Sequence, residues 1–592
     1  MKKLFVISFL FSYQPVFSQP LTTIFEETKG TQSPTYHEII DWWRKLDQQS
    51  PYVKMLTMGM TDAGFPLNLI VVSNDGDYNF ESIHKKNKRV ILINNGIHPG
   101  EPDGIDACML LARDINDFFT NEVRKKGGRS RHNSNDYHLP ENIVLAIIPV
   151  YNIGGCLNRS ANYRIDQNGP LEKGFRGNSQ NLDLNRDFIK CDSREARAFT
   201  EIFHLTDPDV FVDNHVSDGA DYQHIITLLA SQHDKLGGIM GEYMNKEFEP
   251  ALYSLMKEKG YDLVPYVNSF DETPENGWPQ YWDSPRYSSG FATLWRSFAF
   301  VPETHMLKSY EQRVRATYTL MQCFIEFTSK NTDKIKQLRD QTKQSAKTQT
   351  EFPISWELDR SQWKEITYKG YEAGRKISGV SGLPVLFYDR SRPFERQVKL
   401  FNYYHPTTFI KKPIAYIIPQ GWWKVIDLLK LNKVEMRELK KDSSIEVEVY
   451  HIDDYKTAQR QYEMHHLNTK VKISTAKQKI DFKKGDWYIP MNQTANRFLI
   501  ETLEPQAEDS YFAWNFFDTI LGQKEGFSDY VFEDIASDYL KNHPDVKNKL
   551  DQRRSTDTVF AKNAEAQLNF VYQNSPYFEP DYLRYPVYRV ID

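Results

Sequence analysis

The sequence predicts an α/β fold in its N-terminal half, a mixed and mostly parallel sheet flanked by helices, followed by a C-terminal α/β or β-rich region. Between about residues 90 and 327, short apolar runs alternate with amphipathic stretches, which is the pattern of α/β proteins. The runs hold four to eight residues, are rich in Ile, Val and Phe, and are bounded by turn residues, as buried strands are.

The predicted elements follow one another along the chain. We expect strands at the four apolar runs 89–93, 143–150, 209–212 and 298–301. Helix-spaced apolar residues predict helices at 104–119 and 193–205. The polar segment 124–138 has a basic run and is typical of a solvated surface insertion.

The composition changes near Ser329, and we place a domain boundary there. Segment 329–350 is almost wholly polar and is interpreted as a linker or a solvated helix end. Beyond it we expect β-rich stretches at 366–388 and 398–409, then a strand at 414–418 followed by a helix at 422–431. The aromatic segment 509–520 is predicted to lie in a core, because aromatic stripes are more often core than ligand sites. The resulting divisions are 1–18, 19–328, 329–350 and 351–592.

Composition and charge limit the classes of function. The 592 residues include 74 Lys or Arg and 79 Asp or Glu, a net charge of −5, and this balance argues against a general nucleic-acid binder. The four cysteines exclude a scaffold built on disulfides at this length. Cys156 and Cys191 flank one Gly- and Asn-rich loop, and whether they pair is left open because spacing does not show proximity.

The first 18 residues have the features of a secretory signal peptide. Lys2 and Lys3 precede an apolar run at 4–11, and Phe17-Ser18 offers a cleavage point. The run is shorter than the roughly 20 residues that span a bilayer, and no later segment is apolar for long enough. We therefore expect a secreted or periplasmic protein without a membrane span.

Four polar residues at the ends of the predicted strands suit zinc chemistry. His98, Glu101 and His215 form a set of two imidazoles and one carboxylate, which leaves a fourth position for water, as catalytic zinc requires. A further carboxylate, Glu303, is suited to take a proton from that water. Taken alone the signal is weak, since His-x-x-Glu occurs by chance and a strand-end His is more often structural.

The order of the motifs makes a specific resemblance. His98-x-x-Glu101, Asn185-Arg186, Asn214-His215 and Glu303 follow one another in the order of the zinc metallocarboxypeptidases, the carboxypeptidase A-like peptidases. The segments 149–155 and 175–188 are also similar to that family's strand end and substrate loop. The resemblance covers about residues 36 to 327 and implies a carboxypeptidase-like fold.

The resemblance also implies roles for single residues. His98, Glu101 and His215 would bind one zinc ion per chain, with Glu303 as general base and then general acid. Asp183 would be the partner of His98, and Arg176 would stabilise the oxyanion of the scissile carbonyl. A peptide's free C-terminal carboxylate would be held by Asn185 and Arg186. Tyr287, preferred here over Tyr281, would correspond to the family's mobile tyrosine.

The sequence departs from the family at several points. Digestive members carry Arg before the zinc-binding Glu, where this chain has Gly100. The residue expected to line the specificity pocket falls near Thr293 or Leu294, which suggests neither a basic nor an acidic preference. The second half, from about Glu351, matches no catalytic motif and resembles C-terminal extensions that accompany this peptidase domain in exported bacterial proteins.

Three interpretations remain after His-Glu-x-x-His, Gly-x-Ser-x-Gly, Walker and Cys-x-x-Cys motifs are found to be missing from the sequence. The favoured one is a zinc metallocarboxypeptidase acting on peptides with a free C-terminus. The second is a zinc amidase or deacylase that acts on cell-wall peptides or acylated amino acids. The third is a non-catalytic peptide-binding relative, against which the presence of all three ligands and Glu303 argues.

Overall fold

The computed structural model describes residues 21–126, 136–270 and 273–591. The predicted signal peptide at 1–18 and most of the predicted surface insertion at 124–138 lie outside these residues. Within the described ranges, no helix is both long and apolar enough to cross a lipid bilayer.

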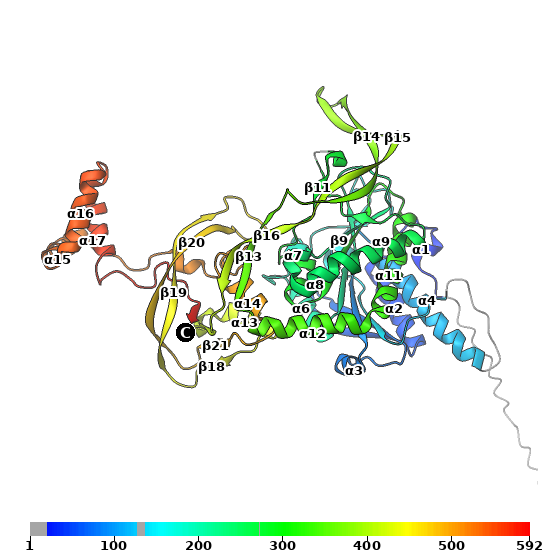
Figure 1. Ribbon diagram of the computed structural model, residues 1–592, viewed down its shortest axis with the longest axis horizontal. Helices are drawn as coiled ribbons and strands as arrows, with labels where there is room; N and C mark the ends of the chain where they lie inside the picture. The colour runs from blue at the N-terminus through cyan, green and yellow to red at the C-terminus, as the bar shows by residue number, and fades with distance from the viewer. Residues whose placement is uncertain (1–20, 127–135, 271–272, 592) are drawn as a thin grey trace, which may run out of the picture.

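A mixed sheet forms the centre of the N-terminal half (Figure 1). Within the described residues it has nine strands, in the order β1-β2-β4-β3-β7-β12-β9-β10, with β8 paired to β12. The strands are β1 Val53–Met60, β2 Pro66–Ser73, β3 Arg89–Asn94, β4 Ile143–Ile148, β7 Val210–Asp213, β8 His215–Ser217, β9 Ile226–Ala230, β10 Val264–Pro265 and β12 Phe298–His305. The pairs among β4, β3, β7 and β12 are parallel, as is the pair of β9 and β10, whereas the pairs β1–β2, β2–β4 and β12–β9 are antiparallel.

The four predicted strands are confirmed as β3, β4, β7 and β12. Their apolar runs are continuous because both faces of the sheet are covered. Val90 and Leu92 of β3 lie in one buried cluster, whereas Ile91 and Ile93 lie in another. Successive side chains of a strand point to opposite faces, so each face of the sheet packs against its own layer.

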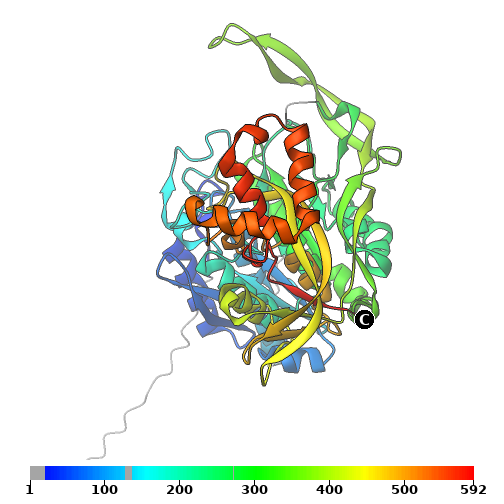
Figure 2. The same cartoon turned by 90° about the vertical axis from the view of Figure 1, so that its left-hand side faces the viewer.

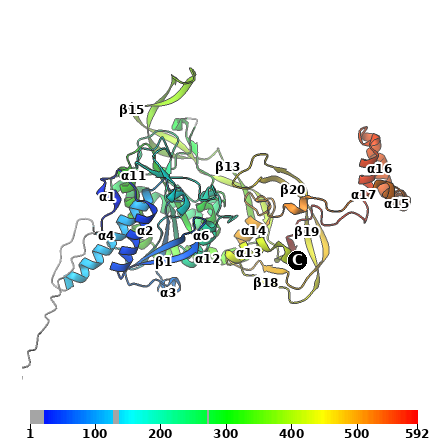
Figure 3. The same cartoon turned by 180° about the vertical axis from the view of Figure 1, so that it is seen from behind.

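Helices supply both layers (Figure 3). The face that carries Ile91 packs against α2 Tyr36–Gln49, α4 Asp103–Lys126, α9 Glu249–Glu258 and α11 Tyr310–Lys330. The face that carries Leu92 packs against α3 Phe80–Lys85, α6 Arg194–Thr206 and α10 Ser288–Leu294. The shorter helices of this half are α1 Ile24–Glu27, α5 Ile153–Leu157, α7 His233–Leu236 and α8 Gly238–Tyr243.

The structure corrects the interpretation of segment 329–350 as a linker. Residues Thr332–Thr348 form helix α12, which follows α11 almost directly. Ile335 and Leu338 are buried against the sheet's helical layer, and Arg339 forms ion pairs with Asp207 and Asp209 at 2.8 and 2.7 Å. The segment is polar in sequence because only a narrow side of this helix is buried.

The C-terminal half is a second, β-rich body with a small helical group at its far end (Figures 1 and 2). Its main sheet has the order β18-β21-β17-β22-β19-β20. The strands are β17 Ala415–Ile418, β18 Arg437–Glu438, β19 Ser443–Thr457, β20 Asn468–Phe482, β21 Trp487–Pro490 and β22 Tyr588–Val590. Other elements are β13 Glu351–Leu358, β14 Lys364–Ile377, β15 Pro384–Phe401, β16 Tyr404–Lys411, α13 Trp423–Leu431, α14 Asn496–Leu503, α15 Asp529–Asn542, α16 Pro544–Thr556 and α17 Ala564–Gln573. The predicted strand and helix at 414–431 are confirmed as β17 and α13.

The two halves share one hydrophobic core. The cluster that contains Leu92 and Phe199 of the N-terminal half also contains Leu428 and Phe498 of the C-terminal half. The aromatic segment 509–520 belongs to the same cluster, and its Trp514 is fully buried, as predicted. The C-terminal half is therefore packed against α6 and α10 and is not a separate domain joined only by a linker.

Candidate metal centre and substrate pocket

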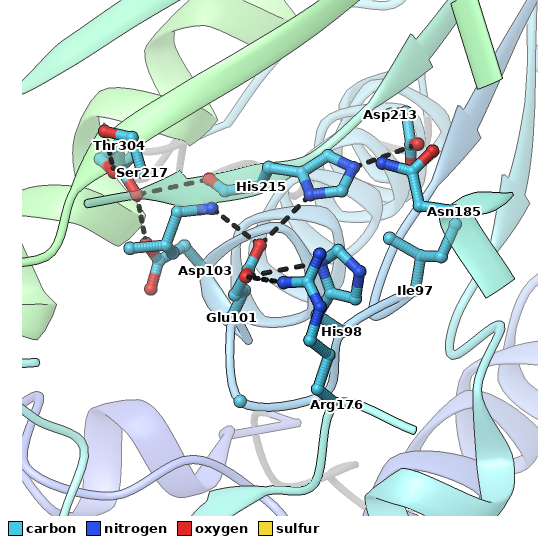
Figure 4. Close-up of polar contacts among 12 residues, drawn as sticks. Ile97, His98, Glu101, Asp103, Arg176, Asn185, Asp213, His215, Ser217 and Thr304 are labelled. Carbon is cyan, nitrogen blue, oxygen red and sulfur yellow. Dashed lines mark hydrogen bonds and ion pairs between the residues drawn. The ribbon is translucent and has the colours of Figure 1, made fainter. Parts of the chain in front are cut away.

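The fold brings the predicted zinc ligands to one edge of the sheet. His98 and Glu101 lie in the turn between β3 and α4, and His215 begins β8. Glu303 of β12 is paired in parallel register with His215. Figure 4 shows the side chains of His98, Glu101 and His215 pointing toward one another. The carboxyl ends of parallel strands form the usual ligand site of such sheets.

Glu101 stands between the two imidazoles. Its Oε1 is 3.3 Å from Nδ1 of His98, and its Oε2 is 3.1 Å from Nδ1 of His215. One ligand atom from each of the three residues lies within 4.8 Å of the other two, and all three side chains are buried. Zinc bonds of about 2 Å place neighbouring ligand atoms at most about 4 Å apart, so small adjustments bring the three onto one ion.

Carboxylates on the outer side fix the orientation of both imidazoles. Nε2 of His98 is 3.0 Å from Asp183 Oδ1, and Nε2 of His215 is 3.1 Å from Asp213 Oδ2. An imidazole that donates Nε2–H to a carboxylate has Nδ1 free to bind a metal. Within the described part of the chain, Nδ1 of His98 is buried and makes no hydrogen bond.

The site fits zinc on the chemistry of its donors. Two Nδ1 atoms and one carboxylate converge, each imidazole has an acidic partner behind it, and a fourth direction opens into a pocket. The prediction of one zinc held by His98, Glu101 and His215 is confirmed.

Arg164 is a further partner of the Glu101 carboxylate. It donates from Nη1 to Glu101 Oε1 at 2.7 Å and from Nη2 to the carbonyl of Val216 at 3.0 Å. Burial would raise the pKa of Glu101, but Arg164 and His98 hold that pKa well below its usual range. Arg164 also occupies the space beside Gly100, where a Cβ would lie 2.7 Å from the Arg164 Cδ.

Glu303 faces the same pocket as the metal ligands. Burial raises the pKa of its carboxyl to about 8, Glu101 adds to the increase, and His215 opposes it. The neighbouring Thr304 donates its hydroxyl to the buried Asp103 at 2.5 Å, which ties β12 to the start of α4 (Figure 4). The strand that carries Glu303 is therefore fixed relative to the zinc-binding turn.

The pocket is a cavity of about 340 Å³. Its lining residues include two groups, here called its two ends: the metal ligands with Glu303, and Asn185 and Arg186, in a 3₁₀ turn Leu184–Arg186, with Tyr287. The guanidinium of Arg186 lies 4.6 Å from the centre of the Tyr287 ring. The Ser288 backbone N–H donates to Asn185 Oδ1 at 3.3 Å, which joins the two loops.

Asp183 links the two ends of the pocket. Its Oδ1 accepts from the His98 imidazole and from the Asn185 backbone N–H, and its Oδ2 accepts from Arg176 Nε at 2.9 Å. Burial would raise the pKa of Asp183, but His98, Arg176 and Arg186 hold it well below its usual range. Arg176 thus lines the pocket as an oriented cation beside the metal ligands.

Arg186 pairs with neither of the adjacent acids Asp187 and Asp213. Asp187 accepts from Lys190 at 2.8 Å, and Asp213 accepts from His215. Arg186 forms an ion pair with Asp183 instead. The distance from its Nη1 to Asp183 Oδ2 is 3.9 Å, which is too long for a hydrogen bond.

The structure corrects one expectation from the sequence and answers one open question. Thr293 and Leu294 do not line the pocket: both are fully buried, because α10 turns them toward the core. The corresponding wall is formed by other residues, namely Leu229, Tyr266, Phe270, Ser289 and Val301. The open question of a disulfide is also answered, since Cys156 and Cys191 are both buried free thiols.

Sequence reasoning missed several residues of the site. Arg164 lies in a loop that has no recognisable motif. Its contacts with Glu101 and Gly100 are therefore found only in the structure. Tyr281, which the sequence analysis weighed against Tyr287, also lines the pocket, with the two ring centres 5.4 Å apart. Glu463 of the C-terminal half accepts a hydrogen bond from the Asp183 backbone N–H at 2.9 Å. No periodicity or spacing relates residues 280 positions apart.

Comparison with known proteins agrees with the metal site. The family model described as Zinc carboxypeptidase matches residues 39–216, the range that contains His98, Glu101 and His215. Similar solved structures include a metallo-carboxypeptidase from Burkholderia cenocepacia (16% identity, 49% of this chain and 68% of that chain, TM-score 0.35) and one from Pseudomonas aeruginosa in complex with (2-guanidinoethylmercapto)succinic acid (13% identity, 50% and 68%, TM-score 0.35). Another is carboxypeptidase A from Helicoverpa armigera (12% identity, 51% and 74%, TM-score 0.33). No curated protein sequence matches this chain.

Proposed function

Because this chain carries a domain of the zinc carboxypeptidase family, matched over residues 39–216, we propose that it removes the C-terminal residue of peptides and recognises the free carboxylate of its substrate. The catalytic residues are Glu303 and Arg176. The substrate-binding residues are Asn185, Arg186 and Tyr287.

The chemistry is divided between the metal and two side chains. Zinc, when bound, supplies a Lewis acid that lowers the pKa of water and polarises the scissile carbonyl. Glu303 accepts the proton of the attacking water and then delivers it to the leaving amine. Burial raises the pKa of Glu303, whereas the positive charge of a bound zinc ion would favour the ionised carboxylate that accepts this proton. Arg176 stabilises the negative charge that develops on the carbonyl oxygen.

One observation carries the exopeptidase proposal, namely the position of Arg186. It lies in the same pocket as the zinc ligands, is largely buried, and is 3.9 Å from its carboxylate neighbour Asp183. A buried guanidinium without a closely bound anion is costly, and its planar fork suits a carboxylate. The terminal carboxylate of a peptide supplies that anion.

We also propose that the protein is exported. The support is the sequence pattern at its N-terminus, in which Lys2 and Lys3 precede the apolar run at 4–11. The mass of the mature protein, recovered from outside the cytoplasm, should correspond to a chain that begins near Gln19. A full-length chain retained in the cytoplasm would contradict export.

A matched pair of peptides tests the exopeptidase proposal. The two share one sequence, and one has a free C-terminal carboxylate whereas the other is amidated. We expect the purified zinc protein to release the last residue of the free acid and to act on the amide with a much lower kcat/KM. Equal cleavage of both peptides would instead favour an amidase or deacylase on the same zinc site.

A further inference from the structure

A loop of the C-terminal half contacts the substrate pocket. Residues 458–467, the Tyr462 loop, connect β19 and β20 in the hairpin visible in Figure 1. The loop is tightly turned, because Tyr462 and His465 exchange two backbone hydrogen bonds of 2.8 and 3.0 Å. His465 also contacts Asp192 through Nε2 at 2.8 Å, so the loop is fastened to the N-terminal half.

Glu463 reaches from this loop to the residue that organises the substrate end of the pocket. Its carboxylate accepts from the Asp183 backbone N–H at 2.9 Å. Asp183 precedes the 3₁₀ turn that carries Asn185 and Arg186, and its own carboxylate accepts from the Asn185 backbone N–H. Glu463 therefore fixes the backbone at the point where this turn begins.

The backbone of the loop is unfavourable in itself. Glu463 and the next residue, Met464, have φ of 48° and 71°, in the left-handed region that residues with a Cβ rarely adopt. Two such residues in succession persist only where the surrounding contacts require them. Here the two hydrogen bonds between Tyr462 and His465 close a two-residue turn that requires positive φ at both central positions, and the contacts of Glu463 and His465 with the N-terminal half support the turn.

Tyr462 and its neighbours support the second loop of the same end. The Tyr462 ring lies 6.2 Å from the Trp514 ring, and the Arg286 guanidinium lies 5.9 Å from the former and 5.2 Å from the latter. Asp509 accepts from the backbone N–H of Arg286 at 2.8 Å, and its carboxylate also forms an ion pair with Arg286, with Oδ1 2.8 Å from Nε. Arg286 immediately precedes Tyr287, whose ring contacts the Arg186 guanidinium. The C-terminal half therefore also fixes the backbone next to Tyr287.

We propose that the C-terminal half completes the substrate site, with Glu463 as the positioning residue that holds Asn185 and Arg186 for the terminal carboxylate of the substrate. This inference rests on the function proposed above. We expect zinc ligation to be unaffected by Glu463, since the partners of His98, Glu101 and His215 lie in the N-terminal half and the hydrogen bond of Glu463 is to the backbone N–H of Asp183, not to its carboxylate. Recognition of the substrate carboxylate, in contrast, needs the assembled chain.

Substitution of Glu463 in the full-length zinc protein tests this. Glu463→Ala removes the acceptor for the Asp183 N–H, whereas Glu463→Gln retains an oxygen that can accept it. For the free-acid peptide we expect Glu463→Ala to raise KM about tenfold, with kcat within about twofold, the size of one hydrogen bond to a charged group. Glu463→Gln should restore most of the loss. Zinc content should equal that of the parent in both variants.

Two controls separate this inference from its premise. Glu446→Ala changes the same residue type at an exposed position of β19 and should leave both kinetic constants unchanged. The amidated peptide should be cleaved equally slowly by the parent and by Glu463→Ala. If the parent discriminates between the peptides but Glu463→Ala has the parent KM, or loses activity equally on both, the role of Glu463 is refuted. If the parent does not discriminate, the proposed function fails instead.

Discussion

The two ends of the pocket differ in how they are held. At the metal end, His98, Glu101 and His215 are buried and their partners lie within about 120 residues of them in the chain. At the carboxylate end, the Arg186 side chain is 21% exposed, and the turn that carries it contacts Glu463, which is 280 residues beyond Asp183. The metal end is therefore a property of one domain, and the carboxylate end a property of two.

This difference separates chemistry from recognition. A change at the metal end should affect every substrate, because the metal and Glu303 act on the scissile bond itself. A change at the carboxylate end should affect only substrates that carry a free carboxylate. Asp183 contacts both ends, since its side chain accepts from His98 and it begins the turn to Arg186.

Removing a metal ligand should have the largest effect. We expect His215→Ala to lose zinc and all measurable turnover, because the set has only three protein ligands. Changes to a ligand's hydrogen-bond partner typically cost about 10–100-fold in metal affinity, so Asp213→Asn should lose zinc to a smaller degree. Elemental analysis after dialysis against a chelator measures both. Near-full zinc in His215→Ala would refute the ligand assignment.

Replacement of the general base comes next in size. Glu303→Gln keeps the shape of the side chain but cannot accept a proton, so kcat should fall by about 10²–10⁴-fold or more. The loss should be the same for free-acid and amidated peptides, and the zinc content should not change. Turnover of Glu303→Gln at the parent rate would mean that another residue is the base.

The sequence predicted the metal end well for physical reasons. Strands β3, β4, β7 and β12 are covered on both faces, so they leave continuous apolar runs; the three ligands follow the runs of β3 and β7, and Glu303 follows the run of β12. In edge strand β1 only Val53 is buried and the other residues are partly or fully exposed, so the strand has no continuous apolar run and was not predicted. The expected linker at 329–350 was wrong because α12 buries only a few of its side chains.

The supports of the carboxylate end were not predictable in the same way. Asn185 and Arg186 lie in a recognisable motif, but Glu463 and Asp509 meet the pocket only through the folding of the C-terminal half. A contact between loops leaves no periodicity in either segment. Thr293 was misplaced for a related reason, since the rotation of α10 about its axis decides which of its residues faces the pocket.

A substitution of Arg186 tests whether the carboxylate end of the pocket binds the terminal carboxylate of the substrate. Arg186→Ala should cost about 2–5 kcal/mol in kcat/KM for the free-acid peptide, the range for loss of a buried charge partner. For the amidated peptide the change should be small. The losses from Arg186→Ala and from amidation should not add, because both remove one contact. Additive losses would show that Arg186 does not bind the terminal carboxylate.

The smallest expected effect concerns Tyr287, whose ring centre lies 4.6 Å from the Arg186 guanidinium. Such a cation–π contact contributes about 0.5–2 kcal/mol, so Tyr287→Ala should raise KM for the free-acid peptide by about two- to thirtyfold. Tyr287→Phe keeps the ring and should raise KM much less. Neither variant should alter the zinc content or the slow cleavage of the amidated peptide. If Tyr287→Phe lost as much as Tyr287→Ala, the hydroxyl rather than the ring would be the group that serves the substrate. A loss on both peptides would place Tyr287 with the catalytic groups of the metal end and break the division between the two.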